Sequence, residues 1–170
     1  MSPTIYSIIL SSLATGTIIT MTSYHWLMAW VGLEINTLAI IPVVSMQHHP
    51  RSTEAATKYF LTQAAASALI LFASTTNAWS TGTWDITQMS STPSHILLTI
   101  ALAMKLGLAP THFWLPEVVQ GSTMTTAFII MTWQKLAPMS LIYLTMNNLS
   151  PTILLLLGMA SSMLGGWAGL

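Results

Sequence analysis

Apolar residues run along the chain in long stretches, and polar residues gather in the short segments between them. A helix that crosses a bilayer needs about 20 mostly apolar residues, and the stretches reach that length. The pattern therefore predicts an all-α fold, a polytopic bundle of transmembrane helices. We expect six spans, at residues 3–21, 25–46, 55–79, 94–120, 123–146 and 151–170.

The fourth of these spans contains residues that break a helix near its middle. Pro110 has no backbone N–H, and its ring clashes with the carbonyl group of Leu106. Gly107 lowers the free-energy cost of leaving helical geometry. We therefore predict one discontinuous helix made of two half-helices. Such discontinuous helices form ion sites in transporters. Their freed backbone groups must be satisfied by protein or trapped water.

Composition narrows the classes of protein that fit this pattern. Of the 170 residues, 53% are hydrophobic and 5% are charged, whereas a soluble domain carries roughly 25% charged residues. These values indicate an integral membrane protein. The net charge of zero argues against a nucleic-acid partner, and the absence of cysteine excludes thiol chemistry within the chain. No phosphate loop, dinucleotide fingerprint or haem ligand pair occurs, so we expect no cofactor, metal or redox centre here.

Three charged residues lie near the middle of apolar spans: Glu34, Lys105 and Lys135. A charge at the centre of a bilayer costs about 3 kcal/mol, and charges kept there usually line ion or proton pathways. Lys105 falls in the last turn of the first half-helix, where the helix dipole favours a cation although burial disfavours it. Similar depth allows the three charges to meet in one layer. Two simpler interpretations stay open: a lysine that snorkels from a kinked helix, and a static ion pair that fixes helix packing.

His112 follows the predicted break. One interpretation is that it bridges Lys105 and Lys135, because histidine titrates near neutrality. The other is a structural hydrogen bond between the histidine and a freed carbonyl group. Both interpretations stay open. The candidate catalytic residues, in the sense of a proton relay, are therefore Glu34, Lys105, Lys135 and His112.

The segments between the spans carry the remaining charges. Arg51 and Lys58 flank the connection at residues 47–54, which by the positive-inside rule faces the cytoplasm or the mitochondrial matrix. Glu54 and Lys58 are spaced for a helical ion pair, and we expect Glu117 to be solvated. Trp26, Trp79, Trp84 and Trp114 fit interfacial anchoring. The last residues, 165–170, have no polar flank, so we expect a fragment of a longer protein.

Four stretches carry a resemblance to a known family: residues 25–36, 50–63, 105–117 and 132–138. In this order they resemble the proton antiporter-like membrane subunits of respiratory complex I, the NADH dehydrogenase of the respiratory chain, in their mitochondrially encoded form. The resemblance implies two inverted repeats of five helices. Residues 1–147 would then form the first repeat, and residues 148–170 would be the first helix of a truncated second repeat.

The resemblance also implies a function. In that family the glutamate that matches Glu34 pairs with the lysine that matches Lys105, and the lysine that matches Lys135 passes the proton on. The implied protein is a multi-pass, proton-translocating, non-redox subunit of NADH:ubiquinone oxidoreductase in the mitochondrial inner membrane. Its partners are other membrane-arm subunits and membrane lipid, and NADH, FMN, iron–sulfur clusters and ubiquinone belong to the rest of the complex. The alternatives are a subunit of a non-redox cation/proton antiporter and a structural scaffold.

Overall fold

All the regular elements in the computed structural model, which describes residues 2–170, are helices. Five helical stretches within these residues are long and apolar enough to cross a membrane, and the helix that begins at Thr92 is shorter. The predicted all-α, polytopic fold is therefore confirmed. The helices are α1 (Pro3–Thr22), α2 (Trp26–Val44), α3 (Pro50–Thr81), α4 (Thr92–Leu106), α5 (Trp114–Gly121), α6 (Met124–Thr132), α7 (Leu136–Thr145) and α8 (Pro151–Ala168), with short 3₁₀ turns η1 (Ser45–Gln47) and η2 (Trp133–Lys135).

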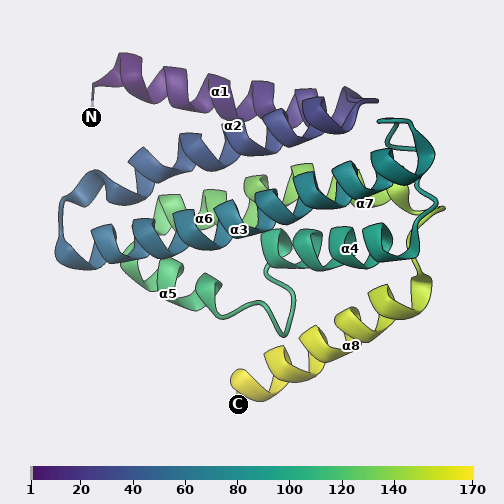
Figure 1. Cartoon of the computed structure of the whole chain (residues 1–170). Coiled ribbons are helices and arrows are strands. Elements are labelled where there is room, and N and C mark those ends of the chain that lie inside the picture. Colours follow the sequence, from purple (N-terminus) through teal and green to yellow (C-terminus); the bar gives the residue numbers. More distant parts are fainter. Residues whose placement is uncertain (1) are drawn as a thin grey trace.

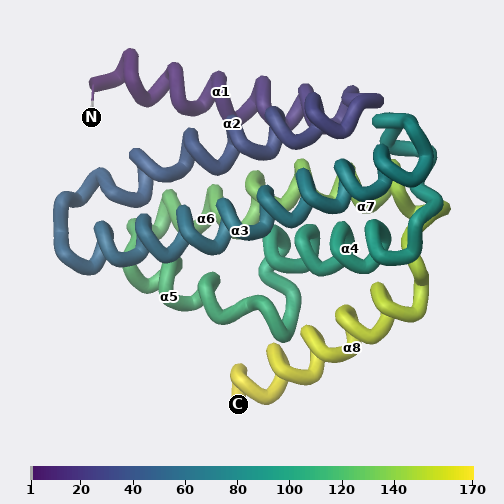
Figure 2. The backbone as a smooth tube through the Cα atoms, in the orientation of Figure 1, coloured from purple at the N-terminus to yellow at the C-terminus, as the bar shows by residue number. Residues whose placement is uncertain are grey.

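Helix α3 organises the bundle. It runs across the whole molecule, and α4 and α5 lie along it one after the other with a loop between them (Figure 1). Helix α2 packs on one side of α3, α1 lies beyond α2, and α6 and α7 lie behind α3. The backbone trace shows α8 turning away from the other helices (Figure 2), and no residue of α8 is buried. The predicted division at residues 147–148 falls in the turn before α8, but the repeat organisation itself stays a prediction.

Helix α3 begins five residues before the predicted start, at Pro50. The side chain of His49 accepts a hydrogen bond from the backbone N–H of Arg51, and the hydroxyl of Ser52 accepts one from the N–H of His49. These reciprocal bonds form a capping box, and Pro50 suits the first helical position because it needs no partner for a missing N–H. Residues that the sequence placed in a connection are therefore helical.

The buried face of α3 consists mostly of small residues, which let neighbouring helix backbones approach closely. Buried apolar side chains form two clusters, which include different stretches of α3: Ile70 and Ala73 in one, and Ala55, Ala56 and Tyr59 in the other. One is centred on Trp26, Ile70 and Leu98, and the other on Ile40, Tyr59 and Val118. The interior of the molecule is thus divided into two apolar regions.

Helices α1 and α2 cross at a pair of glycines. A Cβ atom added at Gly16 would lie 2.5 Å from Oδ1 of Asn36, and one added at Gly32 would lie 2.5 Å from Cγ2 of Thr20. Gly32 also faces the carbonyl oxygen of Gly16, at 2.8 Å from the added Cβ. The crossing therefore requires glycine on both helices.

The fifth span is interrupted as well, although the sequence predicted one continuous helix. Helices α6 and α7 are separated by the 3₁₀ turn Trp133–Lys135. Pro138 explains the interruption, since it cannot donate to the carbonyl of Gln134 and its ring crowds that carbonyl. Gln134 and Lys135 therefore lie in an irregular turn in the middle of the span.

Candidate functional site

The predicted break in the fourth span is confirmed, and it lies between Leu106 and Trp114. Helix α4 ends at Gly107, which has a left-handed backbone with φ of 73°. The N–H of Leu108 donates to the carbonyl oxygen of Ala103 at 3.0 Å, which closes the helix end. The carbonyl oxygen of Met104 accepts from the N–H of Gly107 at 3.3 Å and has a second donor farther along the chain.

Trp114 supplies that second donor. Its Nε1 donates a hydrogen bond to the carbonyl oxygen of Met104 at 3.0 Å, and its ring packs edge-on against Tyr59 with centroids 5.9 Å apart. Trp114 is 8% exposed, so the sequence-based assignment to an interfacial anchor is wrong for this residue. The same holds for Trp26, which is 1% exposed.

Lys105 lies in the last turn of α4 and is 5% exposed. Its Nζ is buried and has no hydrogen-bond partner among residues 2–170. It faces a cavity of about 10 Å³, which is at the lower limit for holding one water molecule. Residues of both apolar clusters contribute to the wall, so the lysine lies where the two clusters meet. The cavity is lined by Leu33, Asn36, Thr37, Tyr59, Gln63, Lys105, Trp114, Gln134, Ala137 and Pro138.

Three amide side chains lie in this wall, Asn36, Gln63 and Gln134, and sequence reasoning placed none of them in the site. Asn36 is 2% exposed, and neither polar atom of its side chain has a partner among the described residues. Gln134 donates from Nε2 to the carbonyl oxygen of Asn36 at 3.3 Å and so joins η2 to α2. A signal for Asn36 and Gln134 existed, because each is a polar residue inside an apolar span, within two positions of Glu34 or Lys135.

Glu34 lies near the middle of α2 and is half-buried. Its Oε2 is buried without a hydrogen-bond partner in residues 2–170. It forms no ion pair with Lys105 among the described residues and does not line the lysine's cavity. Leu33 and Asn36, close to Glu34 in α2, do line that cavity, so Glu34 lies near the site without an ion pair to Lys105.

Lys135 and His112 lie outside the Lys105 cavity. Lys135 ends the η2 turn and is half-buried, next to Gln134 in the cavity wall. His112 lines a second cavity of about 180 Å³ between the break and α8, and its ring stacks on Phe113 with centroids 4.7 Å apart. Its Nδ1 is buried with no partner among the described residues, so neither a lysine nor a freed carbonyl binds that atom.

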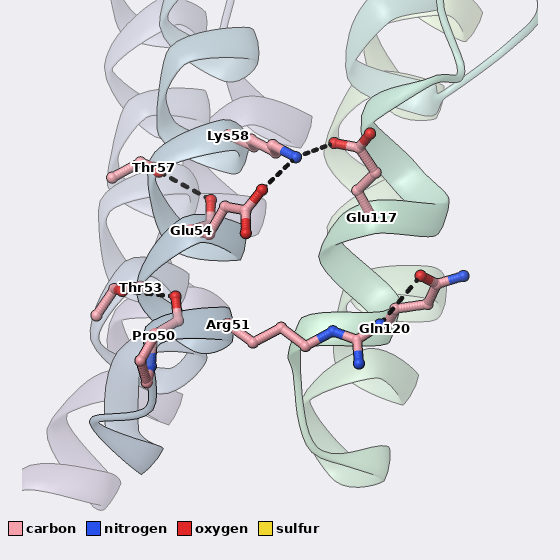
Figure 3. A network of polar contacts seen from close by, with 8 residues as sticks. All are labelled: Pro50, Arg51, Thr53, Glu54, Thr57, Lys58, Glu117 and Gln120. Carbon is pink, nitrogen blue, oxygen red and sulfur yellow. Dashed lines mark hydrogen bonds and ion pairs between the residues drawn. The ribbon is translucent and has the colours of Figure 1, made fainter.

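A polar network joins α3 and α5 at the surface (Figure 3). Lys58 contacts two carboxylates, Glu54 at 2.7 Å and Glu117 at 2.6 Å. Arg51 donates to Oε1 of Gln120 at 3.4 Å. The predicted pair of Glu54 and Lys58 is confirmed, and Glu117, expected to be solvated, is exposed and also pairs with Lys58. These side chains line an open cavity of about 250 Å³.

Comparisons with known proteins agree with this fold. Residues 23–170 match the family described as NADH:quinone oxidoreductase/Mrp antiporter, TM. Over all 170 residues the chain is 58% identical to NADH-ubiquinone oxidoreductase chain 2 of Carassius auratus and 61% identical to the protein of that name from Varanus melinus. The alignment covers 49% of each relative, so the chain spans about half the length of the curated relatives it matches.

Solved structures show the same fold. A chain of respiratory complex I from Thermus thermophilus with bound aureothin superposes with a TM-score of 0.87 at 29% identity, covering 96% of this chain and 39% of that one. A chain of the membrane-bound sulfane sulfur reductase, an archaeal respiratory membrane complex, gives a TM-score of 0.68 at 17% identity, covering 82% of this chain and 32% of that one. The second likeness concerns the fold alone. With the family match over residues 23–170, these findings confirm the resemblance drawn from the four sequence stretches, and the chain belongs to the NADH:quinone oxidoreductase/Mrp antiporter family of transmembrane proteins.

Proposed function

We propose that this chain forms the first half of a proton-translocating membrane-arm subunit, subunit 2, of NADH:ubiquinone oxidoreductase in the mitochondrial inner membrane. Electron transfer elsewhere in the complex drives the translocation, and the chain itself is a non-redox part of the enzyme. The relatives named NADH-ubiquinone oxidoreductase chain 2 support this assignment. One observation carries it: a buried lysine at a helix break, its Nζ without a partner among residues 2–170, in the wall of a small cavity with polar and apolar lining.

The proposed mechanism assigns the proton to the side chain of Lys105. An ammonium group offers three donors, and leaving them unpaired in a buried site is costly. The lysine is therefore sensitive to any nearby change in charge or hydration. In this proposal Glu34 is the carboxylate that controls it, because an approach of a carboxylate favours the charged lysine and its withdrawal favours the neutral amine.

Lys135 completes the relay in this proposal. Like Glu34, it lies near the middle of its span, and in the proposal it competes with Lys105 for the same carboxylate. When Glu34 turns toward Lys135, Lys105 releases its proton, and the charge moves sideways through the bundle. His112, at the break, is the proposed bridge that accepts the proton from Lys105 on its way to Lys135, although it lines a different cavity from Lys105 in this structure.

Partners in the proposal are the other membrane-arm subunits and lipid. Large apolar side chains are exposed on several helices, and no residue of α8 is buried in this chain. Such surfaces suit contact with other subunits or acyl chains. NADH, FMN, iron–sulfur clusters and ubiquinone are assigned to the rest of the complex.

The decisive experiment replaces Lys105 with Ala in the assembled complex and measures protons translocated per NADH oxidised. We expect this ratio to fall sharply while the complex still assembles. Leu106→Ala is the matched control, since it removes buried side-chain volume next to Lys105 without removing a charge. A normal ratio in fully assembled Lys105→Ala complex would exclude the relay, and unchanged activity after neutralising both Glu34 and Lys105 would favour a scaffold.

A cation/proton antiporter that works without redox coupling is the second candidate. The family description, which includes Mrp antiporters, favours it. It uses the same charged residues. Sodium-dependent proton exchange in vesicles that contain the protein but no electron donor would support this candidate over the redox-driven one.

A further inference from the structure

The contact between α3 and α5 has an outer polar side and an inner aromatic side. Lys58 and Tyr59 are neighbours on α3, and Trp114 and Glu117 are one turn apart on α5. The outer pair, Lys58 and Glu117, is an ion pair at 2.6 Å. The inner pair, Tyr59 and Trp114, is an edge-to-face contact with centroids 5.9 Å apart. One interface therefore holds both pairs.

The two sides of this interface face different cavities. Tyr59 and Trp114 line the Lys105 cavity, whereas Lys58 and Glu117 line the open polar cavity at the surface. Figure 3 shows Lys58 on α3 reaching across to Glu117 on α5 at the edge of the bundle. The aromatic pair thus stands between the buried lysine and the polar surface.

We propose that Lys58 and Glu117 are positioning residues that hold α5 on α3 and thereby keep the aromatic pair closed over the Lys105 cavity. Release of the ion pair lets α5 move away from α3 and opens the cavity to water from the polar surface. This regulates the access of protons to the site assigned above, so its purpose rests on the proposed function. The closure itself does not depend on that function.

Helix α5 is suited to such movement. It has eight residues, and the break at residues 107–113 separates it from α4. Its far end has a second contact with α3, because a Cβ atom added at Gly121 would lie 2.5 Å from Cβ of Ala55. Lys58 and Glu117 are partly exposed, at 38% and 54%, and exposed ion pairs are weak enough to open and close readily.

The charges of the network argue against a simple ion-binding site there. Arg51 and Lys58 are balanced by Glu54 and Glu117, and Lys58 is already shared by both carboxylates. A soluble ion of either sign would meet a balanced set of charges that are satisfied by one another. The two ion pairs of Lys58 differ in what they link. The pair with Glu54 lies within α3, whereas the pair with Glu117 links α3 to α5.

That difference provides a matched test. The chain has no cysteine, so Thr37→Cys places a single thiol of this chain in the wall of the Lys105 cavity. The labelling rate of this thiol by a small water-soluble methanethiosulfonate is measured in the assembled complex, with the labelled peptide identified by mass. We expect Glu117→Gln to raise the rate about two- to five-fold, the range over which an exposed ion pair shifts an equilibrium. Glu54→Gln removes the same charge from the same lysine and should leave the rate unchanged.

Two further variants make the result independent of any one substitution. Gly121→Ala should raise the rate by steric displacement of α5, and the exchanged pair Lys58→Glu with Glu117→Lys should return the rate toward its original value. Equal labelling in the Glu54→Gln and Glu117→Gln proteins, or no change in either, overturns the proposal. Proton translocation by the Lys105→Ala complex is measured separately. If Lys105 is needed for translocation but the labelling rates do not change, only the proposed closure is wrong. If the labelling rates change as expected but Lys105 is dispensable, only the proposed relay is wrong.

Discussion

The indole Nε1 of Trp114 donates a hydrogen bond to the carbonyl oxygen of Met104, 3.0 Å away and on the other side of the helix break. In a continuous helix that carbonyl would accept from the N–H of Leu108, which here turns to Ala103. The two half-helices are therefore joined by a side chain of the second reaching back to the backbone of the first. The break therefore has a defined geometry in this structure and is more than a loss of helix.

Replacing Trp114 with Phe tests this link. Phenylalanine keeps an aromatic ring against Tyr59 but lacks the N–H that donates to the carbonyl oxygen of Met104. A buried carbonyl group without a partner costs about 1–3 kcal/mol. We expect a loss at the lower end of that range, because the N–H of Gly107 also approaches the Met104 oxygen at 3.3 Å. Chemical unfolding of the purified chain in detergent measures it. Trp79→Phe, at a position 94% exposed, is the control, and equal losses for the two variants would refute the link.

Substitutions of Gly107 at the end of α4 should lower stability through backbone strain and not through steric crowding. The φ of Gly107, 73°, is left-handed, whereas an added Cβ would meet no heavy atom closer than 3.5 Å. Gly107→Ala should therefore cost about 1–2 kcal/mol through backbone strain. Gly107→Asn should cost less, since asparagine tolerates this conformation. The same unfolding measurement decides, and an asparagine variant less stable than the alanine variant would contradict the explanation.

The crossing of α1 and α2 makes the opposite prediction, in which space is limiting. Gly16 lies in a helix, but a Cβ there would come within 2.5 Å of Oδ1 of Asn36, a side chain in the wall of the Lys105 cavity. Overpacking of this kind costs about 1–3 kcal/mol. We expect Gly16→Ala to lower stability and, by displacing Asn36, to lower proton translocation per NADH in the assembled complex.

Gly158→Ala is the control for that substitution. It lies in α8 with no heavy atom within 4 Å of the added Cβ, so alanine should stabilise the helix by up to about 1 kcal/mol. A Gly16→Ala protein as stable and as active as the Gly158→Ala protein would show that the two helices can separate without disturbing Asn36.

Much of this architecture could be predicted from the sequence. The spans follow from the lengths of the apolar stretches, and the break follows from Gly107 and Pro110, because both are properties of a continuous segment of chain. The early start of α3, at Pro50, was harder to predict. It depends on a capping box built by His49 and Ser52, a pairing that composition and hydropathy do not register.

The contents of the Lys105 cavity show where sequence reasoning ends. Glu34 and Lys105 attract notice because a charge in an apolar span is costly, but neutral amides and indoles cost less and do not stand out. Asn36, Gln134 and Trp114 enter the site through the crossing of α1 with α2, the η2 turn and the course of α5. Those directions are set by contacts between distant segments, so the spacing of residues could not supply them.

The η2 turn gives the last prediction. Pro138 withholds the N–H that would bond to the carbonyl of Gln134, and it also lines the Lys105 cavity. Pro138→Ala restores the donor, so we expect α6 and α7 to merge into one helix. The merger changes the direction of Gln134 and breaks its 3.3 Å hydrogen bond to the backbone of Asn36. Fewer protons per NADH should follow, because the polar wall beside Lys105 is then rearranged.

A structure of the variant complex checks the merger, and the proton-to-NADH ratio checks its consequence. Pro42→Ala is the control, since Pro42 also lies inside a helix but is exposed and outside the Lys105 cavity. If the turn at Trp133–Lys135 persists in the Pro138→Ala protein, contacts with α2 and α7 hold it rather than the missing donor. In that case Gln134 keeps its place and translocation should be normal, which would separate the shape of the fifth span from the chemistry of Lys105.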